Sequence, residues 1–196
     1  MKIILATGNK NKLKEVKEIL PEAEIEGCKT DVEETGKTFK ENALIKAQAV
    51  WDELRLKGIN DAIVIADDSG LCVDALNGEP GIYSARYMGE DTPYQKKNLS
   101  IIEKLNGLEG KERSARFTCA MCAIMPDGEK IFVEEYMEGE ISKEIKGDNG
   151  FGYDPILFLP EYNKTSAQLS PEEKNAISHR GKALRKMASE INFFKG

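Results

Sequence analysis

The chain has 196 residues, of which 40% are hydrophobic and 32% charged, so it can bury one sizeable core. Its formal net charge of −6 argues against a general nucleic-acid binder, because such proteins usually carry an excess of basic residues. No apolar run approaches the roughly 20 residues of a membrane span, and residues 3–6 are too short for the core of a signal peptide. We therefore expect a cytoplasmic protein without membrane contact, folded as a single domain over residues 1–196.

The first third of the chain alternates short apolar runs with helical patterns. Residues 2–6 and 23–28 are expected to form strands, and residues 11–20 between them a helix. A stronger helical pattern covers residues 38–58, with Thr38 and Glu41 as a capping box at its start. A buried strand at residues 62–66 then ends at two adjacent aspartates. Strands that alternate with helices predict an α/β fold.

The rest of the chain adds a long hairpin and further helices. The expected elements are a turn-rich loop at 77–87, a helix at 93–105, strands at 113–125 and 130–139, a glycine-rich loop and strand at 145–160, and a helix at 169–191. A turn joins the two long strands as a hairpin. The last helical pattern can break near Ser178. Together these elements predict a central mixed sheet flanked by helices.

Four cysteines are present, and Cys119 and Cys122 have the C-x-x-C spacing. They lie in an expected strand, where residues three apart point to opposite faces. A shared metal or a disulfide would need a local break in that strand. We therefore expect buried, reduced thiols at this pair rather than a zinc site.

The sequence TGNKNK at residues 7–12 joins the first strand to a helix. The first turn of a helix presents unpaired backbone N–H groups, and Gly8 allows a bulky anion to approach the backbone closely. Thr7 and Asn9 can add hydrogen bonds, and Lys12 can reach back from the first turn. The loop therefore favours an anion-binding site. A capped helix with solvated lysines is the alternative.

The sequence ADDSG places Asp67 and Asp68 at the expected end of a buried strand. Adjacent carboxylates repel each other unless a cation or a donor lies between them. Magnesium is usually held by one or two carboxylates together with phosphate oxygens and water. Glu33 and Glu34 in the preceding acidic loop could add oxygen ligands, whereas Glu41 is accounted for by the helix cap. The alternative is a turn with solvated charges.

Two later segments complete the candidate site. In NGFGYDP, Phe151 or Tyr153 could stack on a planar base and Asp154 could accept from a ring N–H, although a tight turn with buried aromatics is the alternative. His179 is the single histidine of the chain, and a lone histidine is more often a packing residue. Together, an anion loop, paired carboxylates, an aromatic ring and cationic groups are what a nucleoside triphosphate hydrolase needs.

Five motifs occur in order between Lys2 and about Leu184: TGNKNK, ADDSGL, GEPGIYSARY, GFGYDPIL and EEKNAISHRGKAL. They resemble the signatures of the inosine triphosphate pyrophosphatase family. The resemblance implies hydrolysis of the purine nucleoside triphosphates XTP, ITP and dITP to the monophosphate and pyrophosphate, with Mg²⁺ as cofactor. It also implies an elongated, two-lobed fold with the substrate cleft between the lobes, and a homodimer.

The resemblance also assigns roles by motif. Asp68 would be the catalytic base and would lie near the metal, with Asp67 and Glu33 helping to bind Mg²⁺. His179 and Arg180 would read the 6-keto edge of the purine. The other substrate-binding residues would be Thr7, Gly8, Asn9, Lys10, Asn11 and Lys12 at the triphosphate, Ser69, the base-binding and sugar-binding residues Phe151, Gly152, Tyr153 and Asp154, and Lys174 at a phosphate.

Two other functions fit the same motifs. A related pyrophosphatase of similar fold could prefer modified pyrimidine or other nucleotides. A nucleotide sensor could bind without turnover, although the Asp67–Asp68 pair argues against it.

Overall fold

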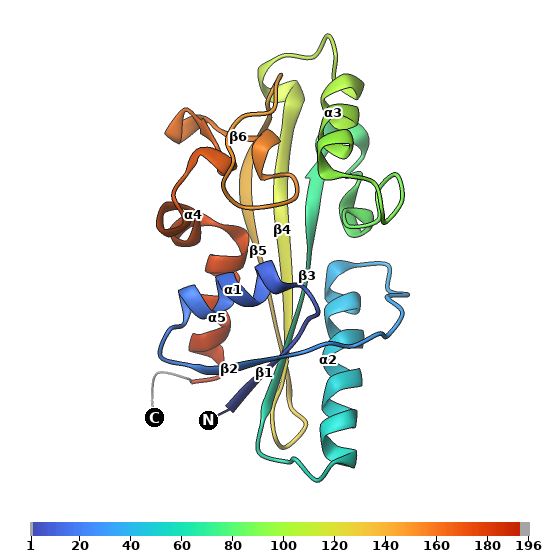
Figure 1. Ribbon diagram of the computed structural model, residues 1–196, viewed down its shortest axis with the longest axis vertical. Coiled ribbons are helices and arrows are strands. Elements are labelled where there is room, and N and C mark those ends of the chain that lie inside the picture. Colours follow the sequence, from blue (N-terminus) through green and yellow to red (C-terminus); the bar gives the residue numbers. More distant parts are fainter. Residues whose placement is uncertain (1, 193–196) are drawn as a thin grey trace. The chain divides into compact units, whose positions relative to one another are not determined.

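The computed structural model describes residues 2–192 of the chain. Within these residues one sheet of seven strands has the order β2-β1-β3-β4-β5-β6-β7 (Figure 1). The strands are β1 (Lys2–Ala6), β2 (Glu24–Cys28), β3 (Ile63–Val73), β4 (Ser114–Ile124), β5 (Lys130–Ile141), β6 (Leu157–Leu159) and β7 (Lys164–Thr165). β1 pairs in parallel with β2 and β3, whereas β6 pairs antiparallel with β5 and β7. The predicted α/β fold with a mixed sheet is confirmed.

The α-helices follow the predicted patterns, and they are α1 (Lys10–Ile19), α2 (Phe39–Leu56), α3 (Tyr94–Lys104), α4 (Pro171–Ile177) and α5 (His179–Glu190). Thr38 caps α2 by accepting from the backbone N–H of Glu41 at 3.1 Å. The Glu41 carboxylate accepts from the backbone of the loop, so half of the predicted capping box forms. The last helical pattern breaks at Ser178, whose extended backbone separates α4 from α5.

Contacts divide the described chain into two compact units. Unit 1 comprises residues 2–68, 119–135 and 180–192, and unit 2 comprises residues 69–118 and 136–179. Strands β3, β4 and β5 contribute residues to both units, so each unit has its own part of the sheet. The elongated shape, the cleft between two lobes and the single domain stay predictions.

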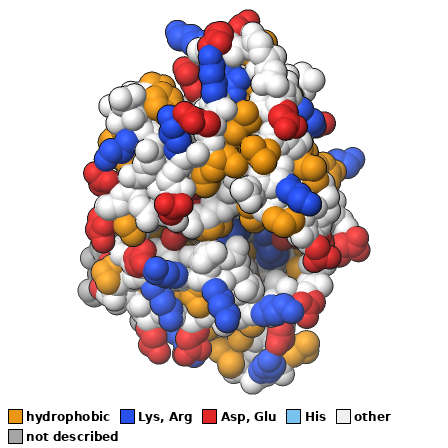
Figure 2. Space-filling view, turned by 45° about the horizontal axis from the view of Figure 1, so that its top comes forward, with side chains coloured by type: hydrophobic (Ala, Val, Ile, Leu, Met, Phe, Trp, Pro, Cys, Tyr) orange, Lys and Arg blue, Asp and Glu red, His pale blue; other side chains and the backbone are white. Residues whose placement is uncertain are grey.

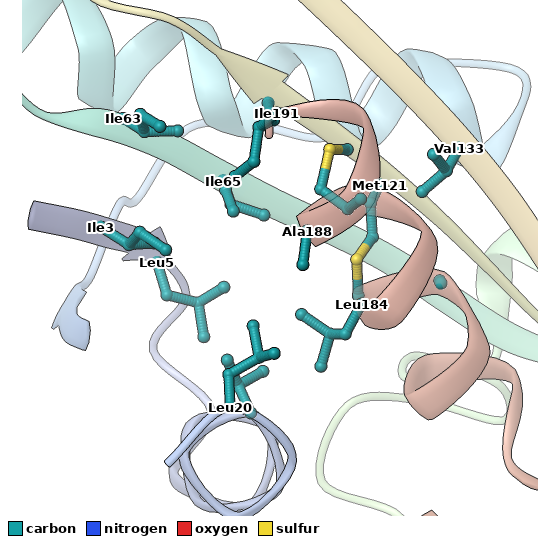
Figure 3. Close-up of a cluster of buried hydrophobic side chains, with 14 of the residues drawn as sticks. Ile3, Leu5, Leu20, Ile63, Ile65, Met121, Val133, Leu184, Ala188 and Ile191 are labelled. Carbon is teal, nitrogen blue, oxygen red and sulfur yellow. The ribbon is translucent and has the colours of Figure 1, made fainter. Parts of the chain in front are cut away.

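Helices cover both faces of the sheet in unit 1. α1 and α5 lie on one face and α2 lies on the other (Figure 1). Ile63 and Ile65 of β3 join the buried cluster with α1 and α5, which Figure 3 shows in close-up. Val64 and Ala66 join the cluster with α2. Successive strand residues point to opposite faces, so a continuous apolar run serves two cores at once.

The two cysteines of β4 follow the same alternation. Cys119 lies in the cluster with α1 and α5, and Cys122 lies in the cluster with α2. Both thiols are free and buried, and burial raises the pKa of Cys122 to about 12. The predicted burial of these two thiols and their opposite facing are confirmed.

In unit 2, α3 packs on a buried cluster built from the continuing strands. Ile101 of α3 and Leu105, the residue that follows the helix, lie in one cluster with Val73 at the end of β3. The glycine-rich loop that follows β5 ends in a short 3₁₀ helix, Asp154–Ile156, and Ile156 belongs to the same cluster. The loop that carries Phe151 is therefore anchored in the core of unit 2.

The surface carries charged side chains of both signs and also exposed hydrophobic side chains. On the face shown in Figure 2, Lys and Arg side chains are interspersed with Asp and Glu side chains. Among residues 2–192, no helix combines the length and the hydropathy that crossing a membrane requires.

Candidate active site

Asp67 and Asp68 lie inside β3, which runs from Ile63 to Val73. The sequence places them after a strand at residues 62–66, and this boundary is wrong. The strand continues because Leu71 and Val73 are buried in unit 2, while the two carboxylates find polar partners in unit 1. The strand geometry turns the two side chains to opposite faces of the sheet.

Asp67 lies on the face covered by α1 and α5, where cations surround it. Its Oδ2 is 2.9 Å from Lys12 Nζ and 3.3 Å from a terminal nitrogen of Arg180. The other terminal nitrogen of Arg180 donates to Glu15 of α1. Burial by itself would raise the pKa of Asp67, but the charges of Lys12, Arg180 and Lys46 outweigh it and hold that pKa below its usual value. The Asp67 carboxylate therefore ties α1 and α5 to β3 through its two ion pairs.

Asp68 lies on the face covered by α2 and has a different environment. Its Oδ2 accepts from Asn42 Nδ2 at 3.0 Å, and its Oδ1 is 3.5 Å from Lys46 Nζ. Lys46 also donates to Glu34 Oε1 at 2.8 Å. Burial raises the pKa of Asp68, and the nearby lysines offset this effect only in part. A carboxylate with a raised pKa is a stronger base than a solvated one.

The loop at residues 7–12 begins α1 in unit 1. The Asn9 side chain caps the helix by accepting from the backbone N–H of Asn11 at 2.9 Å and of Lys12 at 3.3 Å. Thr7 Oγ1 accepts from the backbone N–H of Asn9 at 3.1 Å. Gly8, Asn9, Lys10 and Asn11 are exposed. The helix cap of the alternative interpretation is present, but Lys12 is paired with a buried carboxylate instead of being solvated.

The acidic loop contributes Glu34 to the Asp68 network. Glu33 is exposed and has no recorded hydrogen bond or ion pair among the described residues. Across residues 2–192, no group of three or more His, Cys, Asp or Glu side chains is arranged to hold a metal ion. The Lys46 ammonium nevertheless joins Glu34 to Asp68, so the two carboxylates already share one positive charge. Such a pair of hard oxygen donors fits Mg²⁺ if phosphate oxygens and water complete the ligand set.

The two aromatic residues of the glycine-rich loop in unit 2 have different environments. Tyr153 is buried, donates from its hydroxyl to the Ser84 carbonyl at 2.7 Å and meets the Tyr94 ring edge-on. Phe151 is only half-buried, and Lys174 Nζ lies 5.1 Å from the centre of its ring. The geometry therefore favours Phe151 over Tyr153 as a stacking surface.

The remaining predicted site residues differ in their neighbours. His179 is buried and stacks on Phe117 with 5.0 Å between ring centres, as a packing histidine would. Arg180, next along the chain, belongs to the Asp67 network of unit 1. Ser69 is half-buried in β3.

Sequence reasoning missed Asn42, Lys46 and Glu15. Asn42 and Lys46 are four residues apart on α2, where they interrupt the buried apolar stripe that includes Ala43 and Ala47. Two polar side chains one turn apart within such a stripe could have been recognised in the sequence as candidate site residues. Glu15 carried no comparable signal, because its partner Arg180 is 165 residues away in sequence.

Known proteins match this chain over almost its whole length. A dITP/XTP pyrophosphatase from Clostridium perfringens (strain 13 / Type A) is 48% identical over 197 residues, which cover 97% of each chain. A protein of the same name from Treponema denticola is 47% identical over 202 residues and the full length of both. A sequence model of the Ham1 family matches residues 3–190. This chain belongs to the Ham1 family. The resemblance that the five motifs indicated is confirmed.

Solved structures of Ham1 proteins share the fold. A HAM1 protein from Coxiella burnetii has a TM-score of 0.85 and 38% identity, covering 98% of each chain. The Ham1 protein of Staphylococcus aureus has a TM-score of 0.83 and 40% identity, again over 98% of each chain. The α/β architecture is therefore that of the Ham1 family.

Proposed function

We propose that this Ham1 protein hydrolyses XTP, ITP and dITP to the nucleoside monophosphate and pyrophosphate. Relatives named dITP/XTP pyrophosphatase, at 44–48% identity over nearly the whole chain, support this activity. The observation that carries it is the pair Asp67 and Asp68, whose adjacent carboxylates have pKa values shifted in opposite directions. Such divergence is typical of a site in which one carboxylate binds cations and the other moves a proton.

Asp68 acts as the general base. Its carboxylate takes a proton from a water molecule while the water oxygen forms a bond to the α-phosphorus. The bond from the α-phosphorus to the bridging oxygen breaks, and pyrophosphate leaves. Lys12 is placed by Asp67 at the start of α1, where its charge can neutralise polyphosphate oxygens. The exposed residues 8–11 offer backbone and side-chain contacts to the same group.

Mg²⁺ is the cofactor of this proposal. Asp68 and Glu34 are the supported ligands because they already share the charge of Lys46, while Glu33 and Asp67 are the ligands that the motif resemblance implies. When bound, Mg²⁺ supplies positive charge to the phosphate oxygens. Asp67 is the weaker candidate, because Lys12 and Arg180 already neutralise it.

Base recognition involves unit 2. Phe151 supplies the stacking surface, Gly152, Tyr153 and Asp154 shape its loop, and Lys174 meets the substrate beside it. Ser69 contacts the substrate, and His179 with Arg180 reads the 6-keto edge. A cytoplasmic homodimer completes the proposal, and the motif resemblance supports the homodimer.

The decisive experiment is a pyrophosphate-release assay with Mg²⁺ on ITP, XTP, dITP, GTP, ATP and a set of modified pyrimidine triphosphates. We expect release from ITP, XTP and dITP well above that from GTP and ATP. Faster release from pyrimidine substrates would favour the related pyrophosphatase. Nucleotide binding without release would favour a sensor.

A further inference from the structure

The Asp154 carboxylate is enclosed by donors from three different segments of unit 2. Its Oδ2 accepts from the backbone N–H of Phe151 at 2.8 Å and from Lys174 Nζ at 2.7 Å. Its Oδ1 accepts from the hydroxyl of Ser166 at 2.8 Å. Asp154 is only 2% exposed. A carboxylate held in this way is occupied by the protein itself, which leaves little of it to accept from a nucleotide.

The loop is built to allow this enclosure. Gly150 has a φ of +74°, and a Cβ at that position would lie 2.2 Å from Asp154 Oδ2 and 3.1 Å from Lys174 Nζ. Only glycine combines this backbone conformation with so close an approach. The loop therefore closes tightly around the Asp154–Lys174 ion pair.

Lys174 is held in place by its partners in unit 2. Its side chain is 7% exposed, and its ammonium lies between the Asp154 carboxylate and the face of the Phe151 ring. Asp154 also accepts from the Phe151 backbone, so one carboxylate sets the position of both groups. Ser166, in the 3₁₀ helix Ser166–Gln168, is fully buried and fixes the opposite oxygen of that carboxylate.

We infer that Asp154 and Ser166 are positioning residues that hold Lys174 and the Phe151 loop for the nucleotide, rather than contacts of the nucleotide itself. This inference rests on the proposed function and deepens it, because it assigns Ser166 a role and changes that of Asp154. Charge-assisted hydrogen bonds from three segments give the carboxylate one orientation. A long lysine side chain without this anchor would sample many rotamers and would bind its ligand less well.

Unit 2 contains a matched control. The Asp74 carboxylate likewise accepts from a serine hydroxyl, that of Ser114 at 2.7 Å, and from a cation, Arg116 at 3.0 Å. This second group is partly exposed, with 49% of the Asp74 side chain accessible, and it is outside the glycine-rich loop. Ser114→Ala therefore removes the same kind of hydrogen bond without touching the proposed site.

The kinetic test is a double-mutant cycle measured with ITP. Asp154→Asn alone should lower kcat/KM by about 100-fold, whereas in a Lys174→Gln background it should lower kcat/KM by less than about threefold. Equal losses in both backgrounds would mean that Asp154 acts independently of Lys174, and the inference would be overturned. If Asp154→Asn does not fold, Ser166→Ala takes its place in the cycle. Ser166→Ala should raise KM for ITP by about three- to tenfold with little change in kcat.

A second measurement needs no nucleotide, so it separates this inference from the proposed function. Limited acylation of lysines, read by mass spectrometry, reports how well Lys174 is protected, with exposed Lys143 as the internal standard. We expect Lys174 to react at least about threefold faster in Ser166→Ala and at the wild-type rate in Ser114→Ala. Faster labelling in a chain that hydrolyses no triphosphate would support the positioning and reject the activity. Unchanged labelling of Lys174 in Ser166→Ala would reject the positioning even in an active enzyme.

Discussion

Asp67 and Asp68 are neighbours in β3, yet their carboxylates lie on opposite faces of the sheet and have separate partners. Lys12 and Arg180 pair with Asp67, whereas Asn42 and Lys46 contact Asp68. The pKa of Asp67 is lowered because those cations outweigh its burial, and the pKa of Asp68 is raised because burial outweighs its cations. One dipeptide thus supplies both a fixed anion and a candidate base.

Asp68→Asn should nearly abolish turnover and leave ITP binding largely intact. The amide keeps the shape of the carboxylate but cannot accept a proton at useful strength, and loss of a general base typically costs about 10² to 10⁴ in rate. Single-turnover kinetics and calorimetric titration with ITP would measure the two effects. Asp61→Asn, at an exposed position, is the control. A kcat close to that of the wild type would remove Asp68 from its role.

Lys12→Ala should raise KM for triphosphates more than it weakens binding of the monophosphate product. Lys12 is placed by Asp67 beside the exposed loop at residues 8–11, so its charge should meet the polyphosphate. Lys14→Ala is the matched control, because Lys14 is exposed on the same helix and pairs only loosely with Glu18 at 3.8 Å. Equal weakening for both ligands would contradict this placement.

Lys46→Gln should move the acid limb of the kcat/KM profile to higher pH. Burial raises the pKa of Asp68, and the Lys46 charge offsets part of that rise, so removing the charge raises the pKa further. Activity needs the ionised base, and therefore appears as pH increases through that pKa. Lys40→Gln, on the same helix but over the Phe132 ring, should leave the limb in place. A limb that stays fixed in Lys46→Gln would assign it to another group.

Asp67→Asn should destabilise the fold at neutral pH and make its stability less sensitive to acid. The folded-state pKa of Asp67 lies below the unfolded value of about 3.9, so its contribution is present above that pH and lost as pH falls toward the folded-state pKa. Removing one partner from a buried ion-pair network typically costs about 3–5 kcal/mol. Urea unfolding at pH 7, 5 and 3.5 would measure the difference in free energy of unfolding between the wild type and Asp67→Asn. This difference should be largest at pH 7. A constant difference across these pH values would rule out this linkage.

Arg180→Ala should lower the free energy of unfolding by about 3–5 kcal/mol, because Asp67 and Glu15 would lose a buried cation. If Arg180 also reads the 6-keto edge, the variant should reduce the preference for ITP over ATP by about tenfold. A change of this size corresponds to the free energy lost when one buried donor has no acceptor. Thermal unfolding and kcat/KM for both nucleotides would measure the two roles separately. Lys186→Ala, exposed on the same helix, is the control. An equal fall in kcat/KM for ITP and ATP would limit Arg180 to the fold.

Local patterns predicted most of the secondary structure, because helix caps and hydrophobic periodicity depend on residues that are only one or two turns apart. Thr38 caps α2 at the predicted start, and the expected break of the last helical pattern occurs at Ser178. The end of β3 was misplaced for a local reason as well. Two aspartates and a glycine indicate a turn, and only their partners in the fold allow the strand to continue through them.

By itself, the sequence determined the α/β class, the opposite facing of Cys119 and Cys122, and membership of the Ham1 family, because strand periodicity and ordered motifs are written along the chain. Only the tertiary structure decided which charges meet. Arg180 reaches Asp67 across 113 residues and Glu15 across 165, and Asn42 reaches Asp68 across 26. Such pairings depend on how α1, α2 and α5 dock on the two faces of the sheet, and no local pattern encodes that docking. The pKa values of the two aspartates differ for the same reason, since burial and neighbouring charge are properties of the folded chain.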